Sequence, residues 1–301
     1  MMGAQAVADA RGKAGIAAAL CLAPILATLG VAFADAGIRE ALVGACPLLL
    51  RYGLVMLLPA LLLWALARAL GRSAPAASIL ALAGIIAFIA YAGMAQSAAY
   101  ALLVAVGLVV GSLLYPTPGR SGSVAFTAML GGVGVIAGLV GWLLPMPLHS
   151  AVAYLIAAIL VLVAGRHRLR EAGRPMLEGW SNAVAEQPLA AGFSVAIIGL
   201  AAVPSWLPTL NPDDNAAHLL MARDLLAGSY YRIDASSQVF AVAPWLNNVL
   251  HAMTTVLAGA EARSVIGLGW LLAGCVGAYR VGHLLGARGA FRWLAAALYA
   301  S

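Results

Sequence analysis

The chain has 301 residues, of which 63% are hydrophobic and only 9% are charged. A soluble domain carries about 25% charged residues, so this composition excludes a soluble globular protein and indicates a polytopic membrane protein. The formal charge of +6 comes from arginines in short joints between apolar runs. That placement is typical of the cytoplasmic loops of membrane proteins rather than of a nucleic-acid-binding surface. We therefore expect an all-α transmembrane helical bundle with no nucleic-acid partner.

Apolar runs follow one another along the chain, and a bilayer crossing needs about 20 such residues. The candidate spans are residues 14–34, 48–69, 77–95, 98–115, 124–145, 148–165, 188–207, 243–259 and 264–286, with a tenth beginning near Phe291. The first run follows Lys13 and resembles a signal peptide, but it is longer than the roughly 7–15 residues of a signal core. We therefore expect it to be a retained span.

Glycine pairs within two of these runs indicate close helix packing. Gly134 and Gly138 lie in one run, and Gly274 and Gly277 lie in another. Small residues let helix backbones approach each other in lipid, so we expect helix contacts at these positions.

The basic residues predict how the spans are oriented. With the N-terminus in the cytoplasm, the strongest basic block, GRHRLREAGR at 165–174, also lies inside. We therefore expect an integral protein of a bacterial-type cytoplasmic (inner) membrane, with the segment 208–242 on the outside. The polar segment from 166 to 187 divides the chain into a six-span N-terminal bundle with a cytoplasmic linker, residues 1–187, and a second module, residues 188–301.

Two adjacent carboxylates, Asp213 and Asp214, begin the external stretch DDNAAHLLMARDLLAG. One interpretation is structural, because Asn211 can cap a short interfacial helix, 212–227, whose dipole favours acidic residues in its first turn. The other is functional, because Asp214 and His218 are four residues apart and share a helix face. A carboxylate beside an imidazole can act as a general base or hold a divalent cation. The residues of this stretch leave both interpretations open.

More polar side chains follow this loop. Tyr230 and Tyr231 come directly after the expected helix, and aromatic rings near carboxylates suit a sugar or another polyol. The next run opens with PWLNNVLHAM at 244–253, in which Asn247 lies one turn before His251. Polar groups inside a span are costly and usually face a cavity. We therefore expect Tyr230, Tyr231, Asn247 and His251 to contact a substrate.

The position of Arg280 and Arg288 depends on whether residues 243–259 span. If they do, both arginines lie at the outer surface, where guanidinium groups can bind a lipid-linked phosphate. If they do not, both arginines lie inside with most of the others, and charge alone favours this second arrangement.

From Pro188 onward the order of features resembles the start of the C-type (GT-C) integral-membrane glycosyltransferases, which include protein O-mannosyltransferases and lipid A aminoarabinose transferases. The matching stretches are GFSVAIIGLAAVPSWLP, NPDDNAAHLLMARDLLAGSYY and APWLNNVLHAMTTVLAG. The resemblance implies that residues 243–259 span, and that the donor is a polyprenyl-phosphate-linked sugar. It also implies that Asp213 or Asp214 is the catalytic base or a metal ligand. A full core of this kind has further spans beyond Ser301, so we expect only its N-terminal part here.

The competing class is a transporter or lipid flippase, which would also have many spans and intramembrane polar residues. A transporter more often places its charges at mid-membrane within broken helices, whereas here the acidic residues gather in an external loop. The sequence therefore favours a cell-envelope glycosyltransferase that moves a sugar to an extracytoplasmic acceptor. We expect Asp213, Asp214 and His218 to be catalytic, with a divalent cation at the two aspartates if one is needed, and Arg280 and Arg288 near the donor.

Overall fold

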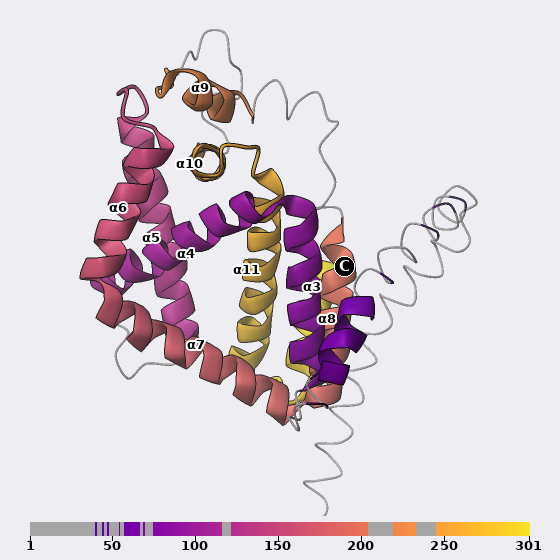
Figure 1. The fold of residues 1–301 in the computed structure, drawn as a ribbon. Helices are drawn as coiled ribbons and strands as arrows, with labels where there is room; N and C mark the ends of the chain where they lie inside the picture. Colours follow the sequence, from indigo (N-terminus) through magenta and orange to yellow (C-terminus); the bar gives the residue numbers. More distant parts are fainter. Residues whose placement is uncertain are drawn as a thin grey trace, which may run out of the picture. The chain divides into compact units, whose positions relative to one another are not determined.

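The structure, a computed structural model, describes residues 57–66, 75–115, 122–203, 219–232 and 245–301, together with single positions between residues 40 and 69. The chain divides into two compact units, residues 1–54 and 55–301, and all the helices discussed below belong to the second. The described part is all-α, as predicted. Its helices, after Leu57–Leu66, are α3 (Ala76–Ala92), α4 (Met94–Leu114), α5 (Gly122–Leu143), α6 (Ala151–Ala164), α7 (Arg166–Glu186), α8 (Pro188–Ala201), α9 (Leu220–Gly228), α10 (Trp245–Ala258), α11 (Arg263–Leu284) and α12 (Ala290–Ala300) (Figure 1).

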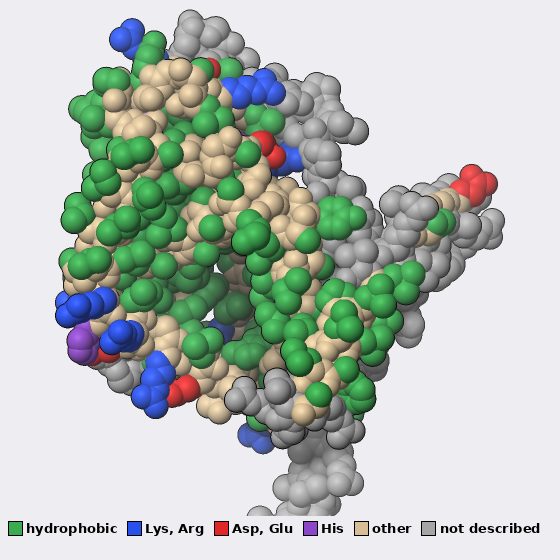
Figure 2. Space-filling view, viewed as in Figure 1, with side chains coloured by type: hydrophobic (Ala, Val, Ile, Leu, Met, Phe, Trp, Pro, Cys, Tyr) green, Lys and Arg blue, Asp and Glu red, His purple; other side chains and the backbone are tan. Residues whose placement is uncertain are grey.

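Three of the described helices, α4, α5 and α11, are each long and apolar enough to cross a membrane. A fourth crossing exists if α6 and α7, which meet at 79°, count as one bent span. Helix Leu57–Leu66, α3 and α8 are shorter apolar helices. Apolar side chains cover the middle of the face shown in Figure 2, and Lys and Arg side chains gather towards its ends. The chain is therefore a polytopic membrane protein, as its composition predicts.

Helices α4 and α5 pack with their backbones in close contact. A Cβ atom added at Gly111 would lie 1.7 Å from the carbonyl oxygen of Ala128, and one added at Gly132 would lie 1.8 Å from that of Gly107. No side chain larger than hydrogen fits at Gly111 or Gly132 without moving the opposite backbone. Small residues therefore set the separation of α4 and α5.

The glycine pairs expected from the sequence differ from these positions. Gly134, Gly138 and Gly277 have open space where a Cβ atom would be added, so the prediction of close packing is wrong for them. Gly274 does pack closely, since a Cβ atom there would lie 2.0 Å from the ring of Tyr299 in α12. The predicted glycine pairs lie in α5 and α11, which both pack through glycine, but of these four residues only Gly274 lies in a close contact.

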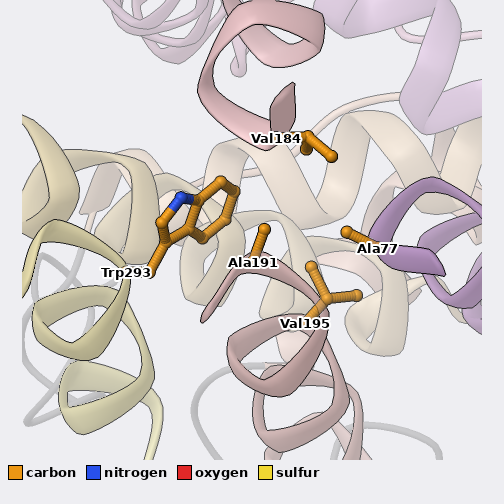
Figure 3. Close-up of a cluster of buried hydrophobic side chains, with 5 residues drawn as sticks. All are labelled: Ala77, Val184, Ala191, Val195 and Trp293. Atoms are coloured by element: carbon orange, nitrogen blue, oxygen red, sulfur yellow. The ribbon is translucent and has the colours of Figure 1, made fainter. Parts of the chain in front are cut away.

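Helices α4, α5 and α6 form a first group. A second group of helices, α3, α8, α11 and α12, packs beside the first. In it, Trp293 of α12, Ala191 and Val195 of α8 and Ala77 of α3 belong to one buried cluster, and Ala191 lies between Trp293 and Ala77 (Figure 3). The Ser194 hydroxyl donates a buried hydrogen bond of 2.9 Å to the backbone carbonyl of Trp293. This bond and the buried ring together fix α8 against α12.

Helix α7 joins the two groups at one end of the unit. Its first half packs on α4 and α5, because Ala172 is buried with Leu108 and Ala125. Its second half packs on α3, α8 and α12 through Val184, which belongs to the cluster in Figure 3. Its arginines remain exposed, so α7 is an amphipathic helix that lies across the ends of the spans. It corresponds to the polar segment predicted from 166 to 187.

Helices α9 and α10 lie at the end opposite α7. Helix α10 packs against α4, α5, α6 and α9, and Figure 1 shows it end-on where α11 is seen along its length. Helix α11 then runs from α10 to the α7 end, where Arg292 lies 3.3 Å from Glu186. This arrangement agrees with the alternative in which residues 243–259 do not span, and it differs from the span that the resemblance implies.

The remaining sequence predictions fall in part outside the described residues. The run 14–34 lies outside them, and the run 48–69 is described only in part. The tenth run corresponds to α12. Helices from both sides of residue 187 pack together, since α3 contacts α8, and the division of the chain at that residue stays a prediction.

Candidate functional site

A group of short elements, which we call the cap, covers the end of the bundle opposite α7. It consists of α9, residues 229–232 and α10. Ser229 has a left-handed backbone conformation with φ 58°, which ends α9. The chain then lies along the α5–α6 turn, where the N–H of Tyr231 donates to the carbonyl of Leu144 at 2.7 Å and the N–H of His149 donates to that of Ser229 at 3.1 Å. These backbone bonds hold the cap on the first helix group.

Helix α10 buries four polar side chains within the cap. Asn248, His251, Thr254 and Thr255 are each at most 4% exposed. Thr254 Oγ1 donates to a backbone carbonyl one turn earlier at 2.7 Å, and Thr255 Oγ1 accepts from the N–H of Ala262 at 3.2 Å. Burying a polar group costs free energy unless it is hydrogen-bonded, and these bonds offset that cost. The result is a polar region at one end of an otherwise apolar bundle.

A side-chain hydrogen bond links α10 to the start of α11. His251 Nε2 lies 3.0 Å from Glu261 Oε1, and the same oxygen accepts the backbone N–H of Arg263 at 2.6 Å. Burial by itself raises the pKa of Glu261. The hydrogen bonds from His251 and Arg263 outweigh burial, so its pKa lies below its ordinary value. The Glu261 carboxylate is therefore held ionised beside the His251 ring.

The other cap residues predicted to bind substrate differ in exposure. The Asn247 side-chain oxygen accepts a hydrogen bond from the indole N–H of Trp270 at 2.7 Å. Tyr230 is 45% exposed, and its ring lies 5.7 Å from the guanidinium carbon of Arg232. Tyr231 is only 3% exposed. Of the tyrosine pair, therefore, Tyr230 presents its ring at the surface and Tyr231 is part of the packing.

A second buried histidine, His149, lies in the α5–α6 turn beneath the cap and is 2% exposed. Its Nε2 lies 2.8 Å from the carbonyl oxygen of Leu143, and its Nδ1 lies 2.6 Å from the hydroxyl of Tyr154. A carbonyl only accepts, so Nε2 carries a proton. Neither His149 nor Glu261 was predicted from the sequence to belong to the site. The available signal was a polar residue two positions before the first residue of a helix, α6 for His149 and α11 for Glu261.

Arg280 and Arg288 do not lie with the cap. The turn that carries Arg288 approaches the junction of α7 and α8, because a Cβ atom added at Gly289 would lie 3.0 Å from the side chain of Gln187. Arg280 lies in the last turns of α11, towards the same end. The structure therefore brings Tyr230, Tyr231, Asn247 and His251 to one end of the bundle and the two arginines to the other.

The three predicted catalytic residues, Asp213, Asp214 and His218, lie outside the described residues. The described residues that flank them, Val203 and Leu219, follow α8 and precede α9. Within the described ranges, no three His, Cys, Asp or Glu side chains come together as metal ligands. The divalent cation at the aspartates thus stays a prediction.

Comparison of the chain with protein families, with curated proteins and with solved structures found no match. The function of this membrane protein therefore has to be inferred from its residues and their arrangement.

Proposed function

We propose that the protein is a membrane glycosyltransferase of the C type, which moves a sugar from a polyprenyl-phosphate donor to an acceptor at the cap surface. One observation carries the proposal: the buried polar residues of α10 gather at the end of the bundle that flanks the Asp213–Asp214 segment in the chain. A membrane protein that concentrates hydrogen-bonding groups at one end has a place there to bind a polar substrate.

The distribution of charges supports a cap that lies outside the cytoplasm. The α7 end carries the exposed arginines of residues 165–174 and also Arg280, Arg288 and Arg292. Basic residues accumulate on the cytoplasmic side of membrane proteins. The opposite end, with the cap, then faces the external compartment, where lipid-linked sugars are used.

In the proposed reaction, the carboxylate of Asp214 or Asp213 accepts a proton from the acceptor hydroxyl or amine. The acceptor atom forms a bond to the anomeric carbon, and the bond from that carbon to the lipid phosphate oxygen breaks. The lipid phosphate leaves with the electron pair of that bond. We assign Tyr230 and Asn247 to contacts with the sugar or the acceptor, His251 to support of the site from beneath, and His218 to the position beside the catalytic base.

The proposal differs from the competing transporter class in where ionisable groups lie. Among the described residues, the buried ionisable side chains are His149, Tyr231 and His251 at the cap end, together with Cys275. No carboxylate or guanidinium group is buried at mid-membrane in the described part of the bundle. This distribution supports a substrate site at the surface of one leaflet rather than a charged path through the bilayer.

The test is sugar transfer by the complete protein in membrane vesicles, with a panel of radiolabelled polyprenyl-phosphate hexoses and pentoses as donors. Replacing the general base, as Asp213→Asn or Asp214→Asn, should lower transfer by about 100-fold or more. Asp224→Asn is the matched control, because Asp224 lies on α9 in the same external segment and should leave transfer unchanged. Full transfer by both of the first two variants would refute the assignment.

A further inference from the structure

A cavity of about 700 Å³ lies between the two helix groups, away from the cap. Its walls come from α3, α5, α7, α8, α11 and α12, and the hollow in the face shown in Figure 2 lies above α7. Sites for small ligands typically have volumes of roughly 300–1,000 Å³ and mostly apolar walls. This cavity has the size and the lining of a binding site that the proposed transfer reaction does not use.

The lining of the cavity changes from polar to apolar along its length. Ser78 and Trp180, whose indole N–H donates to the serine hydroxyl at 3.1 Å, lie at the α7 end. At the far end the walls are Phe88, Ala202 and Leu268. The cavity therefore suits an amphiphile whose polar part lies at α7 and whose hydrocarbon part points towards the cap.

One stripe of helix α11 sets both the polarity and the opening of the cavity. Arg280, Val276, Leu272 and Leu268 all line it and follow one another at intervals of four, so they share a helix face. Val276 and Leu272 are 39% and 42% exposed, which indicates that the cavity opens sideways towards lipid. Arg280 is the single charged residue of the lining among those described. Within the described residues it makes no ion pair or hydrogen bond.

The length of this stripe matches one leaflet of a bilayer. The twelve helical steps from Leu268 to Arg280 extend about 18 Å, and half of a hydrocarbon core of roughly 30 Å is about 15 Å. A lipid of the leaflet at the α7 end would thus place its phosphate at Arg280 and one chain along the cavity. A guanidinium group without an ion-pair partner favours an anionic headgroup over a zwitterionic one.

We propose that this cavity binds an anionic membrane lipid of the α7-side leaflet, with the headgroup phosphate at Arg280 and one hydrocarbon chain between the two helix groups. The site is separate from the cap and does not depend on the transferase proposal.

The test uses the complete protein in vesicles of phosphatidylcholine that contain increasing fractions of dibrominated phosphatidylglycerol or dibrominated phosphatidylcholine. Bromine on the chain quenches nearby tryptophans, and Trp180 and Trp293 both line the cavity. We expect the anionic lipid to quench at a fraction roughly three to ten times lower than the zwitterionic one. Arg280→Gln should abolish this preference, Arg280→Lys should retain most of it, and Ala81→Phe, which fills part of the cavity, should reduce quenching by both lipids.

Arg170→Gln is the matched control, because Arg170 is an exposed arginine of α7 that does not line the cavity, and it should preserve the preference. Thermal unfolding of each variant shows whether it is folded. Three results would overturn the proposal: equal quenching by both lipids in the unchanged protein, an intact preference in Arg280→Gln, or an equal loss in Arg170→Gln. Absence of quenching of Trp180 and Trp293 by either lipid would overturn the proposal as well.

Discussion

Glu261 shows how one residue connects two helices of the cap. Its carboxylate contacts the buried His251 ring and also accepts the first backbone N–H of α11. An isolated histidine at that depth would lack a partner for Nε2, and an unsatisfied buried polar group costs about 1–3 kcal/mol. The single carboxylate therefore allows α10 to bury a histidine and allows α11 to start at Arg263.

The lowered pKa of Glu261 predicts a pH dependence of stability. A group whose pKa is lower in the folded state stabilises that state fully above its unfolded-state pKa of about 4.3, and the contribution is lost as the pH falls through the folded-state pKa. We expect Glu261→Gln to lower the melting temperature above about pH 4.3, and the difference from the unchanged protein to shrink at lower pH. Thermal unfolding in detergent over this range measures it. A difference that is the same at every pH would contradict the prediction.

At the scale of elements, close packing of α4 and α5 depends on glycines at three positions. The contact places Gly111 against Ala128 and Gly132 against Gly107, backbone to backbone. In lipid, van der Waals contact of this kind drives helix association. The hydrophobic effect does not, because a lipid tail is as apolar as the neighbouring helix. The α4–α5 pair thereby provides a rigid base for the cap, which packs on both helices.

This contact predicts different effects for two Gly-to-Ala changes, one in α4 and one in α5. Gly111→Ala would place a Cβ atom 1.7 Å from a carbonyl oxygen, so the helices must separate, and we expect a loss of about 1–3 kcal/mol in unfolding free energy. Gly138→Ala has open space at the added atom and should be neutral or slightly stabilising, because alanine favours helix. Denaturant unfolding in mixed micelles compares the two, and equal losses would show that the glycine contact is not the cause.

At the scale of the whole unit, the position of α10 decides on which side of the membrane the chain continues. Because α10 lies at the cap end and α11 returns to α7, the turn before α12 lies at the same end as the basic residues of α7. Arg292 and Glu186 form an ion pair across that end. If the α7 end faces the cytoplasm, as proposed, the distribution of arginines follows the usual cytoplasmic bias.

Single cysteines in a cysteine-free background test this arrangement. Residues 170 and 288 should react with a membrane-impermeant thiol reagent from the same side, and residues 230 and 260 should react from the other. If α10 crossed the membrane, residue 288 would label together with residue 230 instead. Labelling of intact cells compared with inverted vesicles gives the answer for each position without regard to enzymatic activity.

Much of the helix pattern was predictable from the sequence, and the reasons for the exceptions are physical. Long apolar runs identified α3 to α6, α8 and α11, because hydropathy alone reports on burial in lipid. Residues 243–259 were ambiguous, since their apolar positions also form the buried face of an amphipathic helix, and only packing against α4 and α5 distinguishes the two. Partners such as Glu261 for His251 depend on a turn between helices, which the spacing of residues does not reveal.

The placement of α3 has a consequence for how the chain assembles as it is made. Its Ser78 hydroxyl accepts a hydrogen bond from Trp180, 102 residues later. Ala77 belongs to a buried cluster that includes residues as distant in sequence as Trp293. When α3 leaves the ribosome, none of these partners has yet been synthesised. Long-range contacts of this kind form slowly and leave early segments exposed. We therefore expect α3 to be inserted well before the face that α8 and α12 later occupy is covered by protein.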